Sequence, residues 1–384
     1  MPTEKPIPFS RPTISRAAIQ EVTDCLKSGW LATGQRSEKF EEMLREYFHT
    51  SHALCCISAT MGLWMALEAL DLQPGDEVIT TPMTFVATLN TIVLAGGKPV
   101  LVDVERGTYN IDPKKIAHAI TRKTRAILPV HFAGCPCDLD AIYALAKKHR
   151  LRVIEDCAHA IGAVYKGRRL GSFGDVKVFS FHPNKNMTTG EGGCVVTRDA
   201  KLAKRIEILR FHGIDRAGWI RHGKIPGLGH YDVVEPGLKA NFMDLQAALG
   251  IHQLPALEGF NKTRRELAGR YFQKLRGVPG LTLPTPPRYA HTHAWHLFAP
   301  VVEREARVTR DTLMAELKKR HINTGLHYIA CHLHSYYQKT FGWKRGDFPE
   351  AERISDGILS LPLFPLLTRR DQDRVVRAVR EIMG

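Results

Sequence analysis

The sequence predicts an α/β fold in which helices cover both faces of a mostly parallel sheet. Short, continuous apolar runs recur along the first part of the chain, as expected of strands that are buried on both faces. Helix-like stretches separate most of these runs, which is the alternation of a parallel sheet. The alternation stops after about Leu254, so we expect a large domain over 1–254 and a smaller α+β domain over 255–384.

The elements of the two domains are expected in a definite order. In the first domain, strands are expected at 53–57, 77–80, 99–103, 126–132, 152–155, 176–181 and 194–197. The helices of this domain are expected at 61–70, 87–94 and 139–149. In the second domain, we expect helices at 257–275, 310–320 and 370–383 and a strand at 295–302. Trp295 and Phe298 fit the core of this smaller domain.

Composition and charge indicate an ordinary globular chain with a basic balance. Hydrophobic residues make up 44% of the chain, charged residues 24%, and the formal net charge is +15. The positive residues are dispersed, and the densest groups, 147–150 and 318–320, fit solvated helix faces. The charge is compatible with a phosphorylated ligand, and we expect no nucleic-acid partner. We find no apolar run of about 18 residues and no secretory signal, so we expect a cytoplasmic protein without a membrane span.

Cysteine and histidine spacing does not predict a metal site or a disulfide framework. The eight cysteines are scattered and no CxxC pair is present, and the pair whose spacing comes closest to CxxC is Cys135 and Cys137. Histidines gather at 291–296 and 327–334, but acidic or cysteine ligands are not grouped with them. We therefore expect no metal.

Polar segments follow three of the expected strands, at the edge where ligands bind to parallel sheets. Ser58, Ala59 and Thr60 follow one strand and open a helix, whose N-terminal N–H groups suit a phosphate. A plain helix cap is the ordinary alternative. Asp156 ends a second strand and is suited to pair with a protonated ring nitrogen, although a structural carboxylate fits the position equally well.

Lys185 follows the third strand. Withdrawal from water lowers the pKa of a lysine, and its neutral amine then forms a Schiff base with a carbonyl. An exposed loop lysine is the ordinary alternative. The glycines of 190–193 lack the spacing of a dinucleotide fingerprint and fit a tight return into the next strand. A phosphate site, a carboxylate for a ring nitrogen and an imine-forming lysine together meet the needs of pyridoxal phosphate.

The chain resembles the DegT/DnrJ/EryC1/StrS family of sugar aminotransferases over nearly its whole length. The stretches that carry the resemblance are 28–30, 74–79, 84–88, 155–160, 180–193, 324–328 and 360–365. The resemblance implies fold type I of the pyridoxal phosphate enzymes, with a mostly parallel, seven-stranded type of sheet, and an obligate homodimer that shares its active sites. Within the family, 293–298 and 324–328 look most like the enzymes that make UDP-4-amino-4-deoxy-L-arabinose.

The resemblance also implies roles for single residues. Lys185 would be the catalytic Schiff-base lysine, and Asp156 the partner of the pyridine nitrogen. The other cofactor contacts would come from Ala59, Thr60 and Ser180 at the phosphate, Phe85 on the ring and His159 near the 3-hydroxyl. The substrate side would be lined by Trp30, His182, His327 and Tyr328. Many members have Asn where this chain has Lys239, so either Lys239 or Asn241 would reach the phosphate bound in the partner subunit.

Together with the resemblance, these residues predict an aminotransferase that moves the amino group of glutamate, through pyridoxal phosphate, to a nucleotide-linked 4-keto sugar. A UDP-4-keto-pentose is the expected substrate, in lipopolysaccharide, cell-surface or amino-sugar biosynthesis. Relatives with His in place of the lysine are dehydrases, so Lys185 favours transamination. The alternatives are an aminotransferase for a 3-keto or 4-keto-6-deoxyhexose nucleotide, a pyridoxal phosphate-dependent sugar dehydrase, and a non-catalytic regulatory or nucleic-acid-binding protein.

Overall fold

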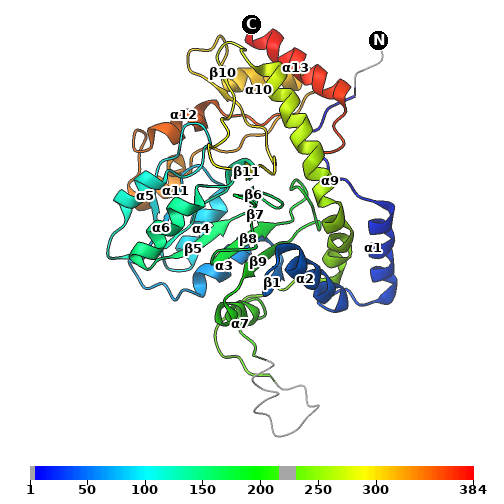
Figure 1. Ribbon diagram of the computed structural model, residues 1–384, viewed down its shortest axis with the longest axis vertical. Coiled ribbons are helices and arrows are strands. Elements are labelled where there is room, and N and C mark those ends of the chain that lie inside the picture. Colours follow the sequence, from blue (N-terminus) through cyan, green and yellow to red (C-terminus); the bar gives the residue numbers. More distant parts are fainter. Residues whose placement is uncertain (1–4, 216–230) are drawn as a thin grey trace.

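The computed structural model describes residues 5–215 and 231–384 and contains the expected sheet (Figure 1). Its seven strands lie in the order β1-β9-β8-β5-β4-β2-β3. They are β1 His52–Cys56, β2 Glu77–Thr80, β3 Lys98–Leu101, β4 Thr124–Ile127, β5 Arg152–Asp156, β8 Val176–Ser180 and β9 Gly193–Thr197. β9 pairs antiparallel with β1 and β8, and the other pairs are parallel. The predicted α/β class is confirmed, although the strand expected at 126–132 ends at Ile127.

The sheet separates two apolar cores because successive side chains of a strand point to opposite faces. Val153 and Phe179 belong to one core, and Ile154 and Val178 to the other. The first core is covered by α2 Gln35–Phe48, α5 Pro113–Ala119, α6 Leu139–His149 and the first part of α9 Asp244–Leu275. The second is covered by α3 Ala59–Glu68, α4 Val86–Leu94 and α7 Ala200–Leu209. Helices therefore cover both faces, as the sequence predicts (Figure 1).

Helix α9 runs from the sheet to the C-terminal end of the molecule (Figure 1). Leu254 and Leu257 pack in the core of the sheet, whereas Tyr271 and Leu275 pack in a separate core. The helix was expected to begin at Leu257, and that start is wrong because the helix continues through Pro255 back to Asp244. The expected border between 254 and 255 falls inside α9, and the division into two domains stays a proposal.

The separate core contains the C-terminal helices. Its elements are the end of α9, α10 Arg310–Lys319, α13 Arg369–Met383, β10 Leu281–Thr282 and β12 Val301–Val302. α10 and α13 match the helices expected at 310–320 and 370–383. Ile7 of the N-terminal segment also packs here and pairs with Ile322. Phe298 is buried in this core and Trp295 packs against it, as predicted.

Several short elements differ from the prediction. The strand expected at 295–302 is wrong except for Val301–Val302, because Trp295 has a φ of 49° and turns the chain out of an extended path. The prediction also missed α2, α5, α7 and β10. Further elements that it missed are α1 Arg16–Ser28, α11 Ser335–Phe341, α12 Pro349–Gly357, β6 Val164–Tyr165, β7 Arg168–Arg169 and β11 His291–Thr292. The last three form a small separate sheet.

The structure also bears on the expectations about membranes and thiols. In the described parts of the chain, we find no helix that is long and apolar enough to cross a bilayer. All eight cysteines lie in these parts, and each is buried and unpaired. Burial raises the pKa of Cys135 to about 12 and that of Cys137 well above its usual value. Both side chains therefore stay as unreactive thiols at neutral pH.

Candidate active site

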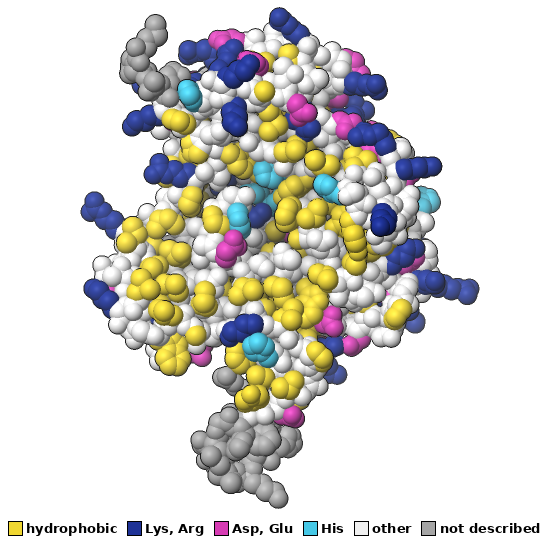
Figure 2. All heavy atoms as spheres, turned by 180° about the vertical axis from the view of Figure 1, so that it is seen from behind, with side chains coloured by type: hydrophobic (Ala, Val, Ile, Leu, Met, Phe, Trp, Pro, Cys, Tyr) yellow, Lys and Arg dark blue, Asp and Glu magenta, His cyan; other side chains and the backbone are white. Residues whose placement is uncertain are grey.

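A cavity of about 300 Å³ opens where β5 and β8 end and α3 begins. Histidine side chains gather in a hollow on the face shown in Figure 2, with hydrophobic side chains around it. The predicted site residues that line the cavity are Ala59, Thr60, Phe85, Asp156, His159, Ser180, His182, Lys185, His327 and Tyr328. Segments that are more than a hundred residues apart in the sequence thus line one cavity, which lies at the carboxyl edge of the sheet.

Three predicted residues do not line this cavity. Trp30 is 61% exposed, and its indole N–H donates to the carbonyl of Thr33 at 3.2 Å. Lys239 is exposed, with its ammonium 4.5 Å from the ring centre of Phe211. Asn241 is nearly buried, and its amide donates to the Thr33 hydroxyl. Their predicted roles therefore stay predictions.

The N-terminus of α3 forms one wall of the cavity. Ser58 caps this helix, because its hydroxyl accepts a hydrogen bond from the Met61 N–H at 3.2 Å. The N–H groups of Ala59 and Thr60 have no partner within the helix, as at any helix N-terminus, and suit an anion. A Cβ at Gly193 would lie 2.5 Å from the Ala59 nitrogen, so glycine is needed for β9 to pass this close. The helix cap is therefore present, and the N–H groups of Ala59 and Thr60 stay suited to an anion.

Asp156 presents a buried carboxylate at the end of β5. Its Oδ2 accepts a hydrogen bond from the Thr88 hydroxyl at 2.9 Å, and its Oδ1 accepts one from the Ala158 N–H at 3.0 Å. Burial raises the pKa of Asp156, although these donors and nearby Lys185 oppose the rise. Each carboxylate oxygen accepts further bonds, so a cationic N–H in the cavity would pair with it and reverse the effect of burial.

Lys185 lies in the turn after β8, where its backbone N–H donates to the carbonyl of His182 at 2.9 Å. Burial lowers the pKa of Lys185 to about 8, and Asp156 opposes this only in part. In about a tenth of the molecules the side chain is then neutral at pH 7, compared with well under a thousandth for a lysine in water. The amine is suited to attack a carbonyl carbon, so the alternative of an ordinary loop lysine does not fit this site.

The cavity also contains neutral histidines. Burial lowers the pKa of His159 well below its ordinary value, and Lys185 and His327 act in the same direction. Burial and Lys185 lower the pKa of His327 to about 4. His327 shares a hydrogen bond of 2.9 Å with the Ser360 hydroxyl and stacks on Phe9, with ring centres 5.2 Å apart. Both histidines therefore act as uncharged hydrogen-bonding groups at neutral pH.

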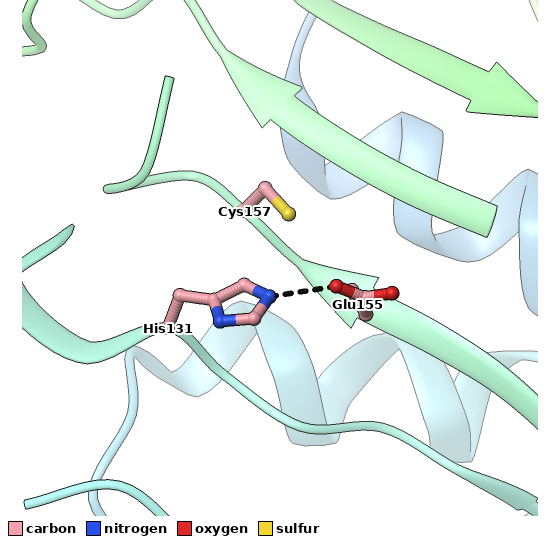
Figure 3. Close-up of side chains that lie close together, drawn as sticks. All are labelled: His131, Glu155 and Cys157. Atoms are coloured by element: carbon pink, nitrogen blue, oxygen red, sulfur yellow. Dashed lines mark hydrogen bonds and ion pairs between the residues drawn. The ribbon is translucent and has the colours of Figure 1, made fainter. Parts of the chain in front are cut away.

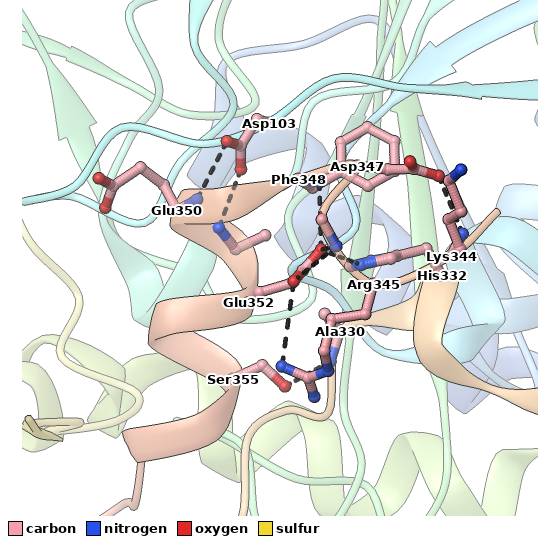
Figure 4. Close-up of polar contacts among 12 residues, drawn as sticks. Asp103, Ala330, His332, Lys344, Arg345, Asp347, Phe348, Glu350, Glu352 and Ser355 are labelled. Atoms are coloured by element: carbon pink, nitrogen blue, oxygen red, sulfur yellow. Dashed lines mark hydrogen bonds and ion pairs between the residues drawn. The ribbon is translucent and has the colours of Figure 1, made fainter. Parts of the chain in front are cut away.

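The segment that carries His327 and Tyr328 is held by α12 (Figure 4). The Ser355 hydroxyl accepts a hydrogen bond from the Ala330 N–H at 2.9 Å. The carboxylate of Glu352 is 3.0 Å from His332 Nε2 and also accepts the N–H groups of Gly346 and Phe348. These buried contacts fix the segment at several points, so α12 contributes to the site without lining it.

Some functional neighbours were missed by the residue-by-residue reasoning. Thr84, Asn184 and Glu191 also line the cavity. Thr88 bonds to Asp156 and to Thr84, whose hydroxyl is 2.7 Å away. Thr84 and Thr88 are four residues apart at the start of α4, so helical spacing was a signal that could have placed them on one face. Nothing in the sequence pattern links Ser360 or Phe9 to His327.

His131, Glu155 and Cys157 are the described side chains that come close enough together to suggest a metal site (Figure 3). Both ring nitrogens of His131 are engaged, since Nε2 is 2.9 Å from Glu155 and Nδ1 accepts the Cys137 N–H at 3.0 Å. Glu155 also pairs with Lys177 at 2.6 Å. Although burial opposes it, Lys177 and His131 lower the pKa of Glu155 to about 2. The group is therefore a satisfied ion-pair network rather than a set of free ligands.

Comparison with known proteins agrees with the geometry of the cavity. The sequence profile of the DegT/DnrJ/EryC1/StrS aminotransferase family matches residues 12–380. The chain belongs to this family. It is 46% identical to the spore coat polysaccharide biosynthesis protein SpsC of Bacillus subtilis over 382 residues, which cover 98% of this chain and 97% of that protein. The predicted family is confirmed, and the finer likeness to the arabinose-type enzymes stays a prediction.

Solved structures of sugar aminotransferases superpose on this DegT/DnrJ/EryC1/StrS protein. The putative sugar aminotransferase Spr1654 from Streptococcus pneumoniae, in its PLP form, matches with a TM-score of 0.91 and 32% identity over 98% of each chain. DesV from S. venezuelae, in complex with a ketimine intermediate, matches with a TM-score of 0.90 and 35% identity over 99% of each chain. The fold is thus fold type I of the pyridoxal phosphate enzymes, as predicted.

Pyridoxal phosphate is the cofactor of this DegT/DnrJ/EryC1/StrS protein, and the residues of the cavity fit it. Lys185 has a partly neutral amine that would suit the cofactor's carbonyl carbon. The buried carboxylate of Asp156 would suit the ring nitrogen, and the N–H groups at the start of α3, where β9 passes close by at Gly193, would suit the phosphate. The three groups line one cavity, so a single bound molecule is able to engage all of them.

Proposed function

We propose that this protein is a sugar aminotransferase that moves the amino group of glutamate, through pyridoxal phosphate, to a nucleotide-linked 4-keto sugar. One observation carries the proposal: Lys185, whose pKa burial lowers to about 8, lines the same cavity as buried Asp156 and the N-terminus of α3. A lysine at this position is what transamination requires, because the same amine must hold the cofactor and then move a proton.

The chain's own residues have separate tasks in this proposal. The bound cofactor supplies an electron sink for the charge left when a proton is removed beside its nitrogen. Lys185 holds the cofactor and then, as a free amine, takes the proton from the α-carbon of glutamate and delivers it to the cofactor. Asp156 keeps the ring nitrogen protonated. The phosphate is bound by the N–H groups of Ala59 and Thr60 and the hydroxyl of Ser180, Phe85 covers the ring, and His159 lies near the 3-hydroxyl.

The uncharged histidines support a sugar as the amino acceptor. His327 and His159 line the cavity as neutral rings, and neutral donors and acceptors match hydroxyl and keto groups better than they match a carboxylate. We assign His182, His327 and Tyr328 to the sugar. A UDP-4-keto-pentose is our preferred substrate because 293–298 and 324–328 resemble the arabinose-type enzymes. The name of the relative SpsC, a spore coat polysaccharide biosynthesis protein, supports a role in polysaccharide biosynthesis. We propose that this role belongs to lipopolysaccharide, cell-surface or amino-sugar biosynthesis.

A homodimer with shared active sites completes the proposal. Large apolar side chains are exposed on α1, on the segment that follows it and on the residues just before α9: Ile19, Leu26, Trp30, Leu31, Leu238 and Met243. An apolar surface of this kind marks an interaction site. Lys239 lies next to Leu238 and is exposed, whereas Asn241 is nearly buried and bonded to Thr33. These differences favour Lys239 as the residue that reaches the phosphate in the partner subunit, with Trp30 at the shared substrate side.

The cofactor part of the proposal is tested with purified protein. Wild-type protein supplied with pyridoxal phosphate should acquire a visible absorbance that glutamate shifts and that sodium borohydride fixes covalently to Lys185. Lys185→Ala should bind the cofactor without this absorbance and lose at least about 10³-fold in rate, since no other group of the cavity replaces the amine. Wild-type protein that stays colourless with pyridoxal phosphate would refute the proposal.

The substrate part needs a panel of keto sugars. UDP-, GDP- and dTDP-linked 4-keto sugars should be incubated with the protein and glutamate, and the products weighed by mass spectrometry. A mass gain for an amino group, matched by release of 2-oxoglutarate, supports transamination. Loss of a hydroxyl without 2-oxoglutarate release would identify a dehydrase instead. The UDP-4-keto-pentose should give the highest kcat/KM, and a better 6-deoxyhexose substrate would overturn that choice.

A further inference from the structure

A second, much smaller cavity also borders Lys185. Its volume is about 10 Å³, and it lies between the N-terminal segment, the turn after β8 and α9. A buried water molecule needs about 10–15 Å³ of such space, so the cavity has room for about one water. Among the described residues that line it, three are basic, namely Arg11, Lys185 and Arg264, and none is acidic. Lys185 therefore separates this small cavity from the large one, which it also lines.

Three buried polar atoms of residues that line the small cavity have no hydrogen-bond partner in the described parts of the chain. They are the Thr13 hydroxyl oxygen, Asn186 Oδ1 and Arg264 Nε. Asn186 is 4% exposed and Arg264 is 2% exposed, so bulk solvent does not satisfy them. Native proteins rarely leave buried polar atoms without hydrogen bonds, because the loss of hydration is then not compensated. One small molecule in the cavity is able to satisfy all three atoms.

The remaining polar atoms of Asn186 and Arg264 are already bonded, which fixes the atoms that are left over. Asn186 Nδ2 donates to Asn261 Oδ1 and to the Ala294 carbonyl, at 2.7 Å each. Since both partners are acceptors, the amide cannot be turned over, and Oδ1 is the atom without a partner. Arg264 Nη1 donates to three backbone carbonyls. Burial lowers the pKa of Arg264 to about 10, so its Nε still carries a proton to donate at neutral pH.

The three atoms require a molecule that both accepts and donates hydrogen bonds. Arg264 Nε only donates, Asn186 Oδ1 only accepts, and the Thr13 hydroxyl does either. An anion such as chloride would suit the basic lining, but the Asn186 oxygen would repel it. Water accepts from Nε, donates to Oδ1 and has a third bond for Thr13, and three bonds are typical of a buried water.

We propose that the small cavity holds one permanently bound water molecule, which joins the turn of Lys185 to the N-terminal segment and to α9. The inference does not depend on the proposed function. Gln253 of α9 already links the same segments, because its Nε2 donates to the Thr13 carbonyl at 2.7 Å and its Oε1 accepts the Thr188 N–H at 3.3 Å. The water adds a second link, so Thr13 is a positioning residue that acts through the water on the turn that carries Lys185.

A high-resolution crystal structure of the full-length protein, grown with bromide in place of chloride, tests what occupies the cavity. We expect density for one water within hydrogen-bond distance of Thr13 Oγ1, Asn186 Oδ1 and Arg264 Nε, without an anomalous signal from bromide. An anomalous peak would show that an anion occupies the cavity, and a lack of density would show that the cavity is empty. Either of these two results would overturn the inference.

Hydrogen exchange in solution tests the link between the segments. Thr13→Val keeps the shape of the side chain but removes the hydroxyl, so the amides of 185–190 should exchange about fivefold faster, because the water loses one of its bonds. Thr13→Ser keeps the hydroxyl and should exchange as the wild type does. Thr263→Val is the matched control: its hydroxyl is exposed on α9 and bonds to the Gly259 carbonyl, so exchange of 185–190 should not change.

The comparison of the two Thr13 variants separates the bound water from ordinary packing. Exchange at the wild-type rate in Thr13→Val would overturn the inference, since the hydroxyl would then contribute nothing to the turn. Equally fast exchange in Thr13→Val and Thr13→Ser would also overturn it, because the effect would come from the shape of the side chain and not from its hydroxyl.

Discussion

Lys185 makes the stability of the cofactor-free protein depend on pH. Burial lowers its pKa from 10.5 to about 8 in the folded chain, so the unfolded chain binds more protons between these values. Stability therefore rises with pH across this window, and below pH 8 the folded state carries the full penalty of a buried charge. The unfolding free energy of wild type relative to Lys185→Met should increase by about 2.5 kcal/mol from pH 8 to 10.5.

Urea titrations at several pH values measure this difference. Lys148→Met, which removes an exposed lysine, controls for the loss of one lysine in general. A wild-type stability that changes with pH in parallel with that of Lys185→Met would contradict the prediction, because it would mean that Lys185 titrates alike in the folded and unfolded chains.

The sequence predicts the residues of the site better than it predicts their contacts. Lys185, Asp156 and the start of α3 could be inferred because each follows a recognisable apolar strand, and strand ends share one edge of a parallel sheet. The bond between His159 and Tyr328 joins residues 169 positions apart. No periodic pattern in the sequence indicates such a pairing. The pairing arises because α12 holds the segment that carries Tyr328 against the cavity. This bond of His159 could therefore be seen only in the folded chain.

At the scale of elements, α12 depends on a cap from a distant part of the chain. Phe348 at its N-cap gives no side-chain hydrogen bond. Asp103, after β3, accepts the N–H groups of Glu350 and Ala351 at 3.1 and 2.9 Å instead (Figure 4). Lys115 lies 3.1 Å from the same carboxylate. Asp103 therefore joins the sheet to the helix that anchors the His327 segment.

Asp103→Ala should lower the unfolding free energy by about 2 kcal/mol, because buried N–H groups and a lysine lose their acceptor. Asp112→Ala, which removes the local cap of α5, should lower it by about 1 kcal/mol or less. Chemical unfolding measures both losses. Equal losses of unfolding free energy in the two variants would mean that the distant cap Asp103 stabilises the protein no more than the local cap Asp112 does.

The elements themselves were predictable where a pattern was long or strongly apolar. The strands of the sheet stand out because they are buried on both faces, and α10 and α13 show clear helical spacing. α9 was misjudged at Pro255, since proline is a common signal for a helix end and the tertiary packing of Leu254 and Leu257 overrides it. The segment at 295–302 has apolar residues without a strand, because contacts with 358–361 replace regular pairing.

At the scale of the whole molecule, the exposed apolar side chains of α1 predict a dimer. Ile19 and Leu26 are 57% and 54% exposed and lie seven residues apart, on one side of the helix. Ile19→Asp combined with Leu26→Asp should shift the protein from dimer to monomer at about micromolar concentration, because two unpaired charges would be buried at the interface. The cofactor absorbance should weaken with it if Lys239 of the partner helps to bind the phosphate.

Sedimentation velocity distinguishes the two states. Gln20→Asp, on a neighbouring side of α1, controls for an added charge on this helix. A wild-type protein that sediments as a monomer at every concentration would disprove the predicted homodimer, and a double variant that still sediments as a dimer would place the interface elsewhere.

Because α9 belongs to both cores, the gene cannot be divided at the border that the sequence suggests. A fragment ending at residue 254 would retain the first turns of α9 but lose Leu257 from the core of the sheet. The complementary fragment would begin inside the helix. Leu267 and Tyr271 would keep their own core in this fragment, but Leu257 would lose the core of the sheet and become exposed. Each fragment would expose apolar surface that is buried in the whole protein, and we expect it to aggregate when expressed alone. Engineered shortening or fusion of this protein therefore has to keep the helix whole.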